Sequence, residues 1–162
     1  MRRFTIILAL FAVAALSPAA ALGKAKGTDR PQKGTSTSTT TVNLATGTGS
    51  VVGSGQLSHL GRFTFTNDIT SFTLTGNTFS FTFTGILVAA NGDEVYTSAT
   101  ATGTLTATGS EGTAVSTVTG GTGRFADASG TLTTSISSEI VSTVGTTLTT
   151  RDIETQKGRI SY

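Results

Sequence analysis

Residues 78–85 read TFSFTFTG, a strict alternation of apolar and hydroxylated side chains. Phe79, Phe81 and Phe83 occupy one parity, and threonine and serine residues occupy the other. Successive side chains of a β-strand point to opposite faces, so this pattern predicts a strand with one apolar and one polar face. Threonine is also β-branched, which favours extended backbone over helix. The alternation therefore indicates a sheet protein.

Similar alternation runs through most of the chain beyond residue 40. The parity of Phe63 and Phe65 differs from that of Phe72, so we expect a bulge or a turn near Asn67–Asp68. Glycine-containing turn signals such as Asn91–Gly92 separate the alternating runs. They delimit about eight predicted strands, at residues 41–48, 50–58, 62–74, 78–89, 93–108, 113–119, 124–141 and 146–160.

The short connections between these runs predict antiparallel neighbours in a meander. Such a sheet has to protect its two edge strands, and closure into a barrel removes the edges completely. We therefore expect an all-β fold, an eight-stranded antiparallel meander β-barrel over residues 40–162. The interior of a barrel of this size is filled by side chains or holds one small ligand.

The N-terminus has the composition of a secretory signal peptide. Arg2 and Arg3 precede an apolar run at residues 4–16, and the small residues 19–21 follow. The apolar run is too short for a membrane span, which needs about 20 residues. We expect residues 1–21 to be a signal peptide, cleaved after Ala21 or Gly23, and the protein to be secreted; the alternative is an uncleaved N-terminal anchor.

Residues 22–39 are basic and contain few apolar side chains, so we expect a disordered tail or linker there. The formal net charge of +2 includes Arg2 and Arg3, so nine basic and nine acidic residues remain without the signal peptide. Phosphate binding needs clustered lysine and arginine, and this composition argues against nucleic acid as a partner.

The chain contains no cysteine and one histidine, His59. Disulfides and thiolate metal centres are therefore excluded, and His59 has neither a second histidine nor a cysteine as a co-ligand. We expect no metal and no cofactor. A turn histidine with local hydrogen bonds is the simpler interpretation of His59.

Residues 120–133, GGTGRFADASGTLT, contain four glycines within strand-forming sequence. We expect Gly120, Gly121 and Gly123 to form a tight reversal, and Gly130 to bend a long strand in its middle. A phosphate-binding loop is the alternative, but it requires a following helix, and TLTTSIS is strand-forming.

The same glycine stretch carries a family resemblance. GGTGRF followed by Ala128-Ser129-Gly130 resembles a signature of plant dirigent proteins and allene oxide cyclases. Together with SHLGRFT (58–64) and AANGDEVY (89–96), it makes residues 40–162 similar to small exported bacterial proteins with an allene-oxide-cyclase-like barrel. The resemblance implies a calycin-like barrel related in shape to lipocalins, with an apolar cavity and often a homotrimeric assembly.

The resemblance implies less about chemistry. The plant cyclases are thought to use a buried glutamate with a nearby cysteine, and this chain has no cysteine. Dirigent proteins steer phenoxy-radical coupling with acidic residues in the cavity, and no single acid here aligns with those positions. A shared fold does not by itself establish a shared activity.

Polar candidates for a site lie near the Asn91–Gly92 turn. Glu94 and Tyr96 share one strand face, and they would sit at a barrel mouth if the threonine-rich face pointed inward, able to bind or protonate a ligand. Arg62 and Asp68 are further candidates for polar groups of a cavity. A solvated charged turn with a rim aromatic is the alternative for the first pair, and ordinary surface positions for the second.

The phenylalanines are the larger candidate set. Burial of each contributes roughly 2–3 kcal/mol, so packing in the core is their default role. In an incompletely filled barrel the same side chains would line an apolar pocket. The residues concerned are Phe63, Phe65, Phe72, Phe79, Phe81, Phe83 and Phe125.

Three classes of function follow. The first is a non-catalytic binding or scaffold module that holds a small hydrophobic molecule. The second is a cyclase-like or dirigent-like protein acting on a hydrophobic or phenolic substrate, which requires acids inside the barrel; Glu94, Asp68 and Glu111 are the acids considered. The third is a cell-surface interaction protein, for which the Thr-x-Thr rows would have to form a flat, regular array.

Overall fold

The structure, a computed structural model, describes residues 27–162. It contains eight β-strands and one 3-10 helix, η1, at Gly123–Phe125. The strands are β1 (Asp29–Asn43), β2 (Thr48–Leu57), β3 (Gly61–Thr75), β4 (Thr78–Ala89), β5 (Glu94–Leu105), β6 (Gly109–Gly121), β7 (Ser129–Val144) and β8 (Thr147–Ser161).

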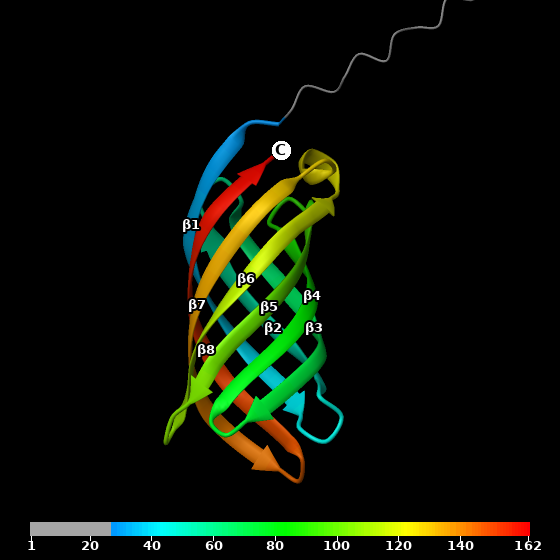
Figure 1. Cartoon of the computed structure of the whole chain (residues 1–162). Helices are drawn as coiled ribbons and strands as arrows, with labels where there is room; N and C mark the ends of the chain where they lie inside the picture. Colours follow the sequence, from blue (N-terminus) through cyan, green and yellow to red (C-terminus); the bar gives the residue numbers. More distant parts are fainter. Residues whose placement is uncertain (1–26) are drawn as a thin grey trace, which may run out of the picture.

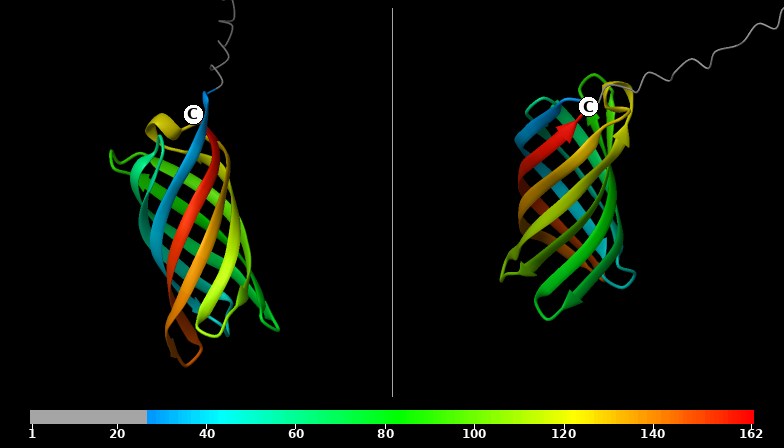
Figure 2. Two further views of the ribbon diagram at one scale, coloured as in Figure 1. Left: turned by 90° about the vertical axis from the view of Figure 1, so that its left-hand side faces the viewer. Right: turned by 45° about the horizontal axis from the view of Figure 1, so that its top comes forward.

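The strands form a closed antiparallel barrel in the order β1 to β8, which confirms the predicted fold class. Each strand pairs with the next along the chain, and β8 pairs with β1 over its whole length to close the sheet (Figure 1). The strands run steeply tilted around the barrel axis (Figure 2). We call the end with the C-terminus the upper end and the end with the β1–β2, β3–β4, β5–β6 and β7–β8 turns the lower end, as in Figure 1.

The threonine-rich face of most strands points outward. Along β4, Phe79, Phe83 and Leu87 are buried, while Thr82 and Thr84 are exposed. Because the sheet closes on itself, the outward threonine rows lie on a curved wall and not on a flat face. Residues 27–162 contain no helix with the length and apolar composition that a membrane-spanning helix requires.

A bulge in β3 explains the parity change predicted near Asn67–Asp68. Ile69 pairs with Phe83 and Ser71 pairs with Thr82, so Thr70 is the extra residue. The Thr70 hydroxyl lies 3.2 Å from the Thr82 carbonyl oxygen. The extra residue switches the inward parity from odd to even. It therefore turns Phe72 to the same side of the wall as the earlier phenylalanines of β3.

The prediction of a disordered tail is wrong for residues 29–39. They form most of β1, pairing with β8 from Asp29 and with β2 from Gly34. The predicted strand 41–48 is wrong as well, because residues 44–47 form the β1–β2 turn. The predicted signal peptide and its cleavage site lie outside the described residues.

The upper end is closed by apolar side chains. Phe125 from η1 is fully buried, and its ring meets the Tyr162 ring edge-on with centroids 4.7 Å apart. Leu57, Val95 and Ile160 are also almost fully buried near this end. These large apolar side chains form a buried plug at the upper end.

Polar contacts tie the upper loops together. The Asp93 carboxylate, in the β4–β5 turn, accepts hydrogen bonds from the Asn91 side chain at 2.8 Å and from the Arg124 backbone at 3.3 Å. The Arg124 guanidinium donates to the Leu60 carbonyl of the β2–β3 turn at 3.2 Å. The three sequence stretches that carry the family resemblance thus meet at one end of the barrel, where they hold the loops.

The glycines of this region divide into turn and strand positions. Gly120 and Gly121 end β6, and Gly123 begins η1 with φ +53°. Gly130 was expected in mid-strand, but it is the second residue of β7, because residues 123–128 form the 3-10 helix and the loop that follows. Its φ is +145°, and a Cβ there would overlap the Arg159 carbonyl, so the position requires glycine.

Candidate functional site

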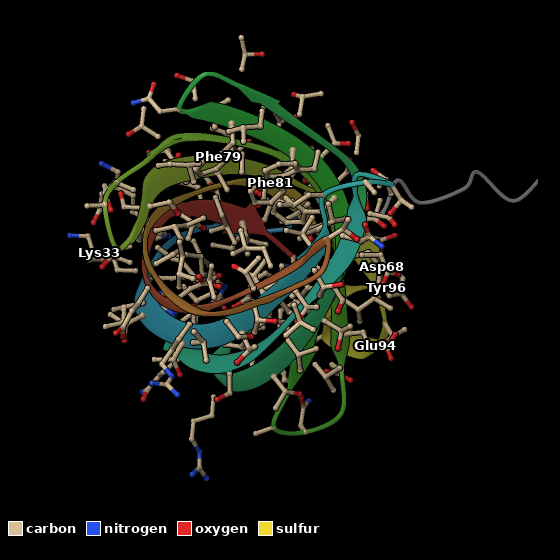
Figure 3. All side chains as sticks on the ribbon, turned by 90° about the horizontal axis from the view of Figure 1, so that it is seen from below. Lys33, Asp68, Phe79, Phe81, Glu94 and Tyr96 are labelled. Carbon is tan, nitrogen blue, oxygen red and sulfur yellow. The ribbon has the colours of Figure 1, made fainter. Side chains whose placement is uncertain are left out.

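The polar residues predicted at a barrel mouth lie on the outer wall. Glu94 and Tyr96 are half-buried on the outward face of β5, and the Tyr96 hydroxyl donates a 2.7 Å hydrogen bond to Glu94 Oε2. This hydrogen bond, with smaller contributions from desolvation and from the Glu94 charge, raises the pKa of Tyr96 above its ordinary 10.0. Figure 3 shows both side chains outside the barrel.

The other predicted polar candidates also face outward. Arg62 and Asp68 are exposed on β3, and Asp68 lies outside the wall in Figure 3. Glu111 is exposed on β6, where it accepts a hydrogen bond from Ser137. The acids considered from the sequence are therefore all outside the barrel.

Six of the seven predicted phenylalanines line internal chambers. Phe72, Phe79, Phe81 and Phe83 line a lower chamber, which has a volume of about 90 Å³. Phe63, Phe65 and Phe83 line an upper chamber of about 60 Å³. Phe125 lines neither chamber, because it belongs to the plug of the upper end.

The lower chamber is accessible from the lower end of the barrel. Phe72, Leu105 and Leu148 line its outer part, and all are only half-buried. Figure 3 looks into this end and shows Phe79 and Phe81 on the inner side of the wall. Deeper in, Val42, Val51 and other buried apolar side chains complete the lining.

The two chambers meet at a shared layer of side chains. Asn67, Phe83, Ile136 and Glu154 line both of them. An apolar cavity of about 150 Å³ is large enough for benzene. The lower chamber, at about 90 Å³, is smaller than this, and only the two chambers together reach about 150 Å³, the scale of a single ring.

Inward-facing glycines give the large inner side chains their space. A Cβ on Gly103 would lie 2.5 Å from the tip of the Phe79 ring, and one on Gly53 would lie 2.6 Å from the tip of the Phe65 ring. Both glycines lie on strands next to the phenylalanine they accommodate. Small residues opposite large ones are how a narrow barrel fits its interior side chains.

Two carboxylic acids that the sequence analysis did not single out lie inside the barrel. Asp152 and Glu154 are on the inward face of β8, only 2% and 6% exposed. Asp152 lines the lower chamber and Glu154 lines both. The sequence does carry a signal for their inward position. Leu148 and Ile160, apolar residues near the two ends of β8, are an even number of residues away from both acids, so all four side chains share one face of the strand.

Hydroxyl groups from β1 hold Glu154 in place. Ser36 Oγ lies 2.5 Å from Glu154 Oε2, and Ser38 Oγ lies 2.8 Å from Oε1. The side-chain amide of Gln156 donates to the same Oε2 at 3.3 Å. Both carboxylate oxygens of Glu154 are thus hydrogen-bonded, which offsets part of the cost of burying them.

Hydroxyl groups also hold Asp152, which lies nearer the lower end of the barrel than Glu154. Thr40 Oγ1 lies 2.5 Å from Oδ2, Thr150 Oγ1 lies 2.8 Å from Oδ1, and Ser38 Oγ lies 3.1 Å from Oδ2. Ser38 therefore bridges the two acids. The hydroxyl groups come from the inward faces of β1 and β8, the two strands that close the barrel.

The buried acids have no basic partner. Within residues 27–162, no lysine, arginine or histidine lines either chamber. The nearest basic residue in sequence, Arg151, is exposed on the outer face of β8. Arg30 lies at the upper end, with its guanidinium 5.2 Å from the centre of the Tyr162 ring. The chambers thus combine aromatic walls with two buried carboxyl groups that lack a basic partner within residues 27–162.

The fold and site define a small up-and-down β-barrel with internal chambers. No protein-family model, curated protein or solved structure matches the chain. The resemblance to allene-oxide-cyclase-like and dirigent-like proteins stays a prediction.

Proposed function

We propose that this chain is an exported binding module that holds one small, largely apolar molecule inside its barrel. The observation that carries the proposal is the lower chamber, an accessible pocket of about 90 Å³ walled by four phenylalanines. Pockets for small molecules are concave and mostly apolar, with a few polar groups that fix orientation. Asn67 and the two β8 acids supply such groups here.

Blocking the chamber tests the proposal. Ala101 is buried and lines the lower chamber, while Thr100 beside it is exposed on the outer wall. Ala101→Leu fills the chamber, and Thr100→Leu adds a side chain of the same size outside it. We expect calorimetric titration with 2-phenylethanol to show binding to the parent protein and to the Thr100 variant, and none to the Ala101 variant.

Native mass spectrometry complements this test. Protein purified from its own secretion route is expected to carry a small adduct that the Ala101→Leu variant lacks. Absence of binding by both parent and Thr100→Leu protein, with the fold intact by circular dichroism, would refute the binding module.

Export is part of the proposal and rests on the sequence of residues 1–21. N-terminal sequencing of protein recovered from culture medium should begin after Ala21 or Gly23. Recovery of the protein only inside cells with Met1 retained contradicts it.

A second candidate function is acid–base or radical-steering chemistry on a hydrophobic or phenolic molecule. It is favoured by Asp152 and Glu154, because an acid inside an apolar chamber can transfer a proton to or from a bound group. Coupling of a phenolic substrate by an added one-electron oxidant is the assay. Stereoselective product with the parent, and racemic product with Asp152→Asn/Glu154→Gln protein, would support this candidate.

A further inference from the structure

We propose that the ligand of the barrel carries a positively charged amine on a small aromatic or apolar body. This inference rests on the proposed binding function and names the chemical class of its ligand. It follows from three observations: two buried acids without a basic partner, unpartnered amide groups beside them, and aromatic walls on the same chamber.

The first observation is a pair of buried carboxyl groups. Asp152 and Glu154 share the inward face of β8 at positions two residues apart. Their hydrogen-bond partners are neutral hydroxyl and amide groups. Buried carboxylates are normally paired with a positive group, and none from residues 27–162 is present in either chamber. A cationic ligand would supply the missing charge.

Asn67 is the second, independent observation. It lies on β3, is 8% exposed and lines both chambers. Its side-chain amide makes no hydrogen bond to any residue between 27 and 162. This amide has no protein partner among residues 27–162, so it is available to hydrogen-bond a molecule in the chamber.

Gln156 adds a further acceptor in the same layer. Its Nε2 donates to Ser36 Oγ at 2.9 Å, but its Oε1 is buried and has no hydrogen-bond partner. Gln156 lines the upper chamber together with Glu154 and Asn67. An ammonium group has up to three hydrogens to donate and no acceptor, which matches carboxylate and amide oxygens.

The walls indicate an organic cation in preference to a metal ion. Phe79, Phe81 and Phe83 line the lower chamber beside Asp152 and Glu154. Phenylalanine faces attract cations and also bury apolar surface, whereas a hard metal ion prefers a shell of six or more oxygens. An amine on a single ring would place its ring among the phenylalanines and its nitrogen at the shared layer.

Three molecules of matched size test the inference. They are 2-phenylethylamine, 2-phenylethanol and 3-phenylpropionate, titrated into the full-length mature protein by calorimetry. We expect the amine to bind at least about tenfold more tightly than the alcohol, and the anion to bind most weakly. Calcium chloride is titrated in parallel.

Variants assign the preference to the acids. In Asp152→Asn/Glu154→Gln protein the amine should lose its advantage over 2-phenylethanol. Glu139→Gln, which removes an exposed acid from the outer face of β7, is the matched control and should leave the amine preference intact. If the double variant does not fold, Asp152→Asn alone replaces it, and the comparison of the three molecules on the parent needs no variant.

The outcomes separate the two proposals. Binding of the alcohol without a preference for the amine overturns the inference and leaves the binding module standing. Calcium binding with no amine preference overturns it as well. Binding of none of the three molecules overturns the binding module itself.

Discussion

The Ser38 hydroxyl donates a hydrogen bond to Glu154 Oε1 at 2.8 Å across the seam where β1 closes on β8. Ser38 Oγ also lies 3.1 Å from Asp152 Oδ2. Ser38 and Asp152 are direct cross-strand partners, and so are Ser36 and Glu154. The polar layer inside the barrel therefore also holds the first and last strands together.

Removal of this hydroxyl should destabilise the fold. Ser38→Ala removes the one hydroxyl that contacts both buried carboxyl groups, which costs about 1–3 kcal/mol. Urea unfolding measures the change in unfolding free energy. Thr39→Ala, on the exposed face of the same strand, is the control and should cost less than about 1 kcal/mol. Equal losses for the two variants would contradict a role for the seam hydroxyl.

The Asn67 side chain occupies space that is free because its cross-strand partner on β4 is Gly85. A Cβ at Gly85 would overlap the Asn67 side-chain oxygen. We expect Gly85→Ala to cost about 1–3 kcal/mol. In an Asn67→Ala background the cost should fall, giving a coupling energy of roughly 0.5–3 kcal/mol in a double-mutant cycle. Additive losses would show that Asn67 does not occupy this space.

The barrel could be predicted from sequence because most strands show a contrast between two faces. The TFSFTFTG run of β4 places phenylalanine inside and threonine outside, and the structure confirms this. The start of β1 lacks that contrast: Ser36 and Ser38 face inward, and Thr35 and Thr37 face outward. Hydroxyl groups on both faces gave residues 29–39 the appearance of a disordered tail.

The site was harder to predict because its acids, like the serines of β1, are polar side chains that face inward. The sequence predicted packing in the core for seven phenylalanines, or the lining of a pocket in an incompletely filled barrel, and six of them line a chamber. It directed attention to acids near turns, such as Glu94, because charges at turns are conspicuous. Asp152 and Glu154 lie in mid-strand, and only the pairing of β8 with β1 shows that serine and threonine hydroxyls are there to receive them.

The upper loops make a testable contact between Asp93 and Gly123. Gly123 has φ +53°, and a Cβ there would overlap the Asp93 carboxylate. Gly145 has a similar φ of +58°, but a Cβ built there would have no neighbouring atom within 4 Å. Alanine at either position pays a backbone cost of about 1–2 kcal/mol. We expect Gly123→Ala to lose more than Gly145→Ala in thermal unfolding, and the excess to disappear in an Asp93→Ala background; equal losses would contradict the contact.

Tyr96 should titrate above its ordinary range because its hydroxyl donates to Glu94. The raised pKa means that the neutral phenol is favoured in the folded state. The stabilisation is complete below the ordinary pKa of 10.0 and is lost as the pH rises through the higher folded-state value. Tyr162→Phe leaves Tyr96 as the only tyrosine, so ultraviolet absorbance reports its ionisation alone. In that background Glu94→Ala should lower the midpoint toward 10.0, while Glu111→Ala, on the outer face of β6, should leave it unchanged. A midpoint indifferent to Glu94 would mean that the hydrogen bond does not persist in solution.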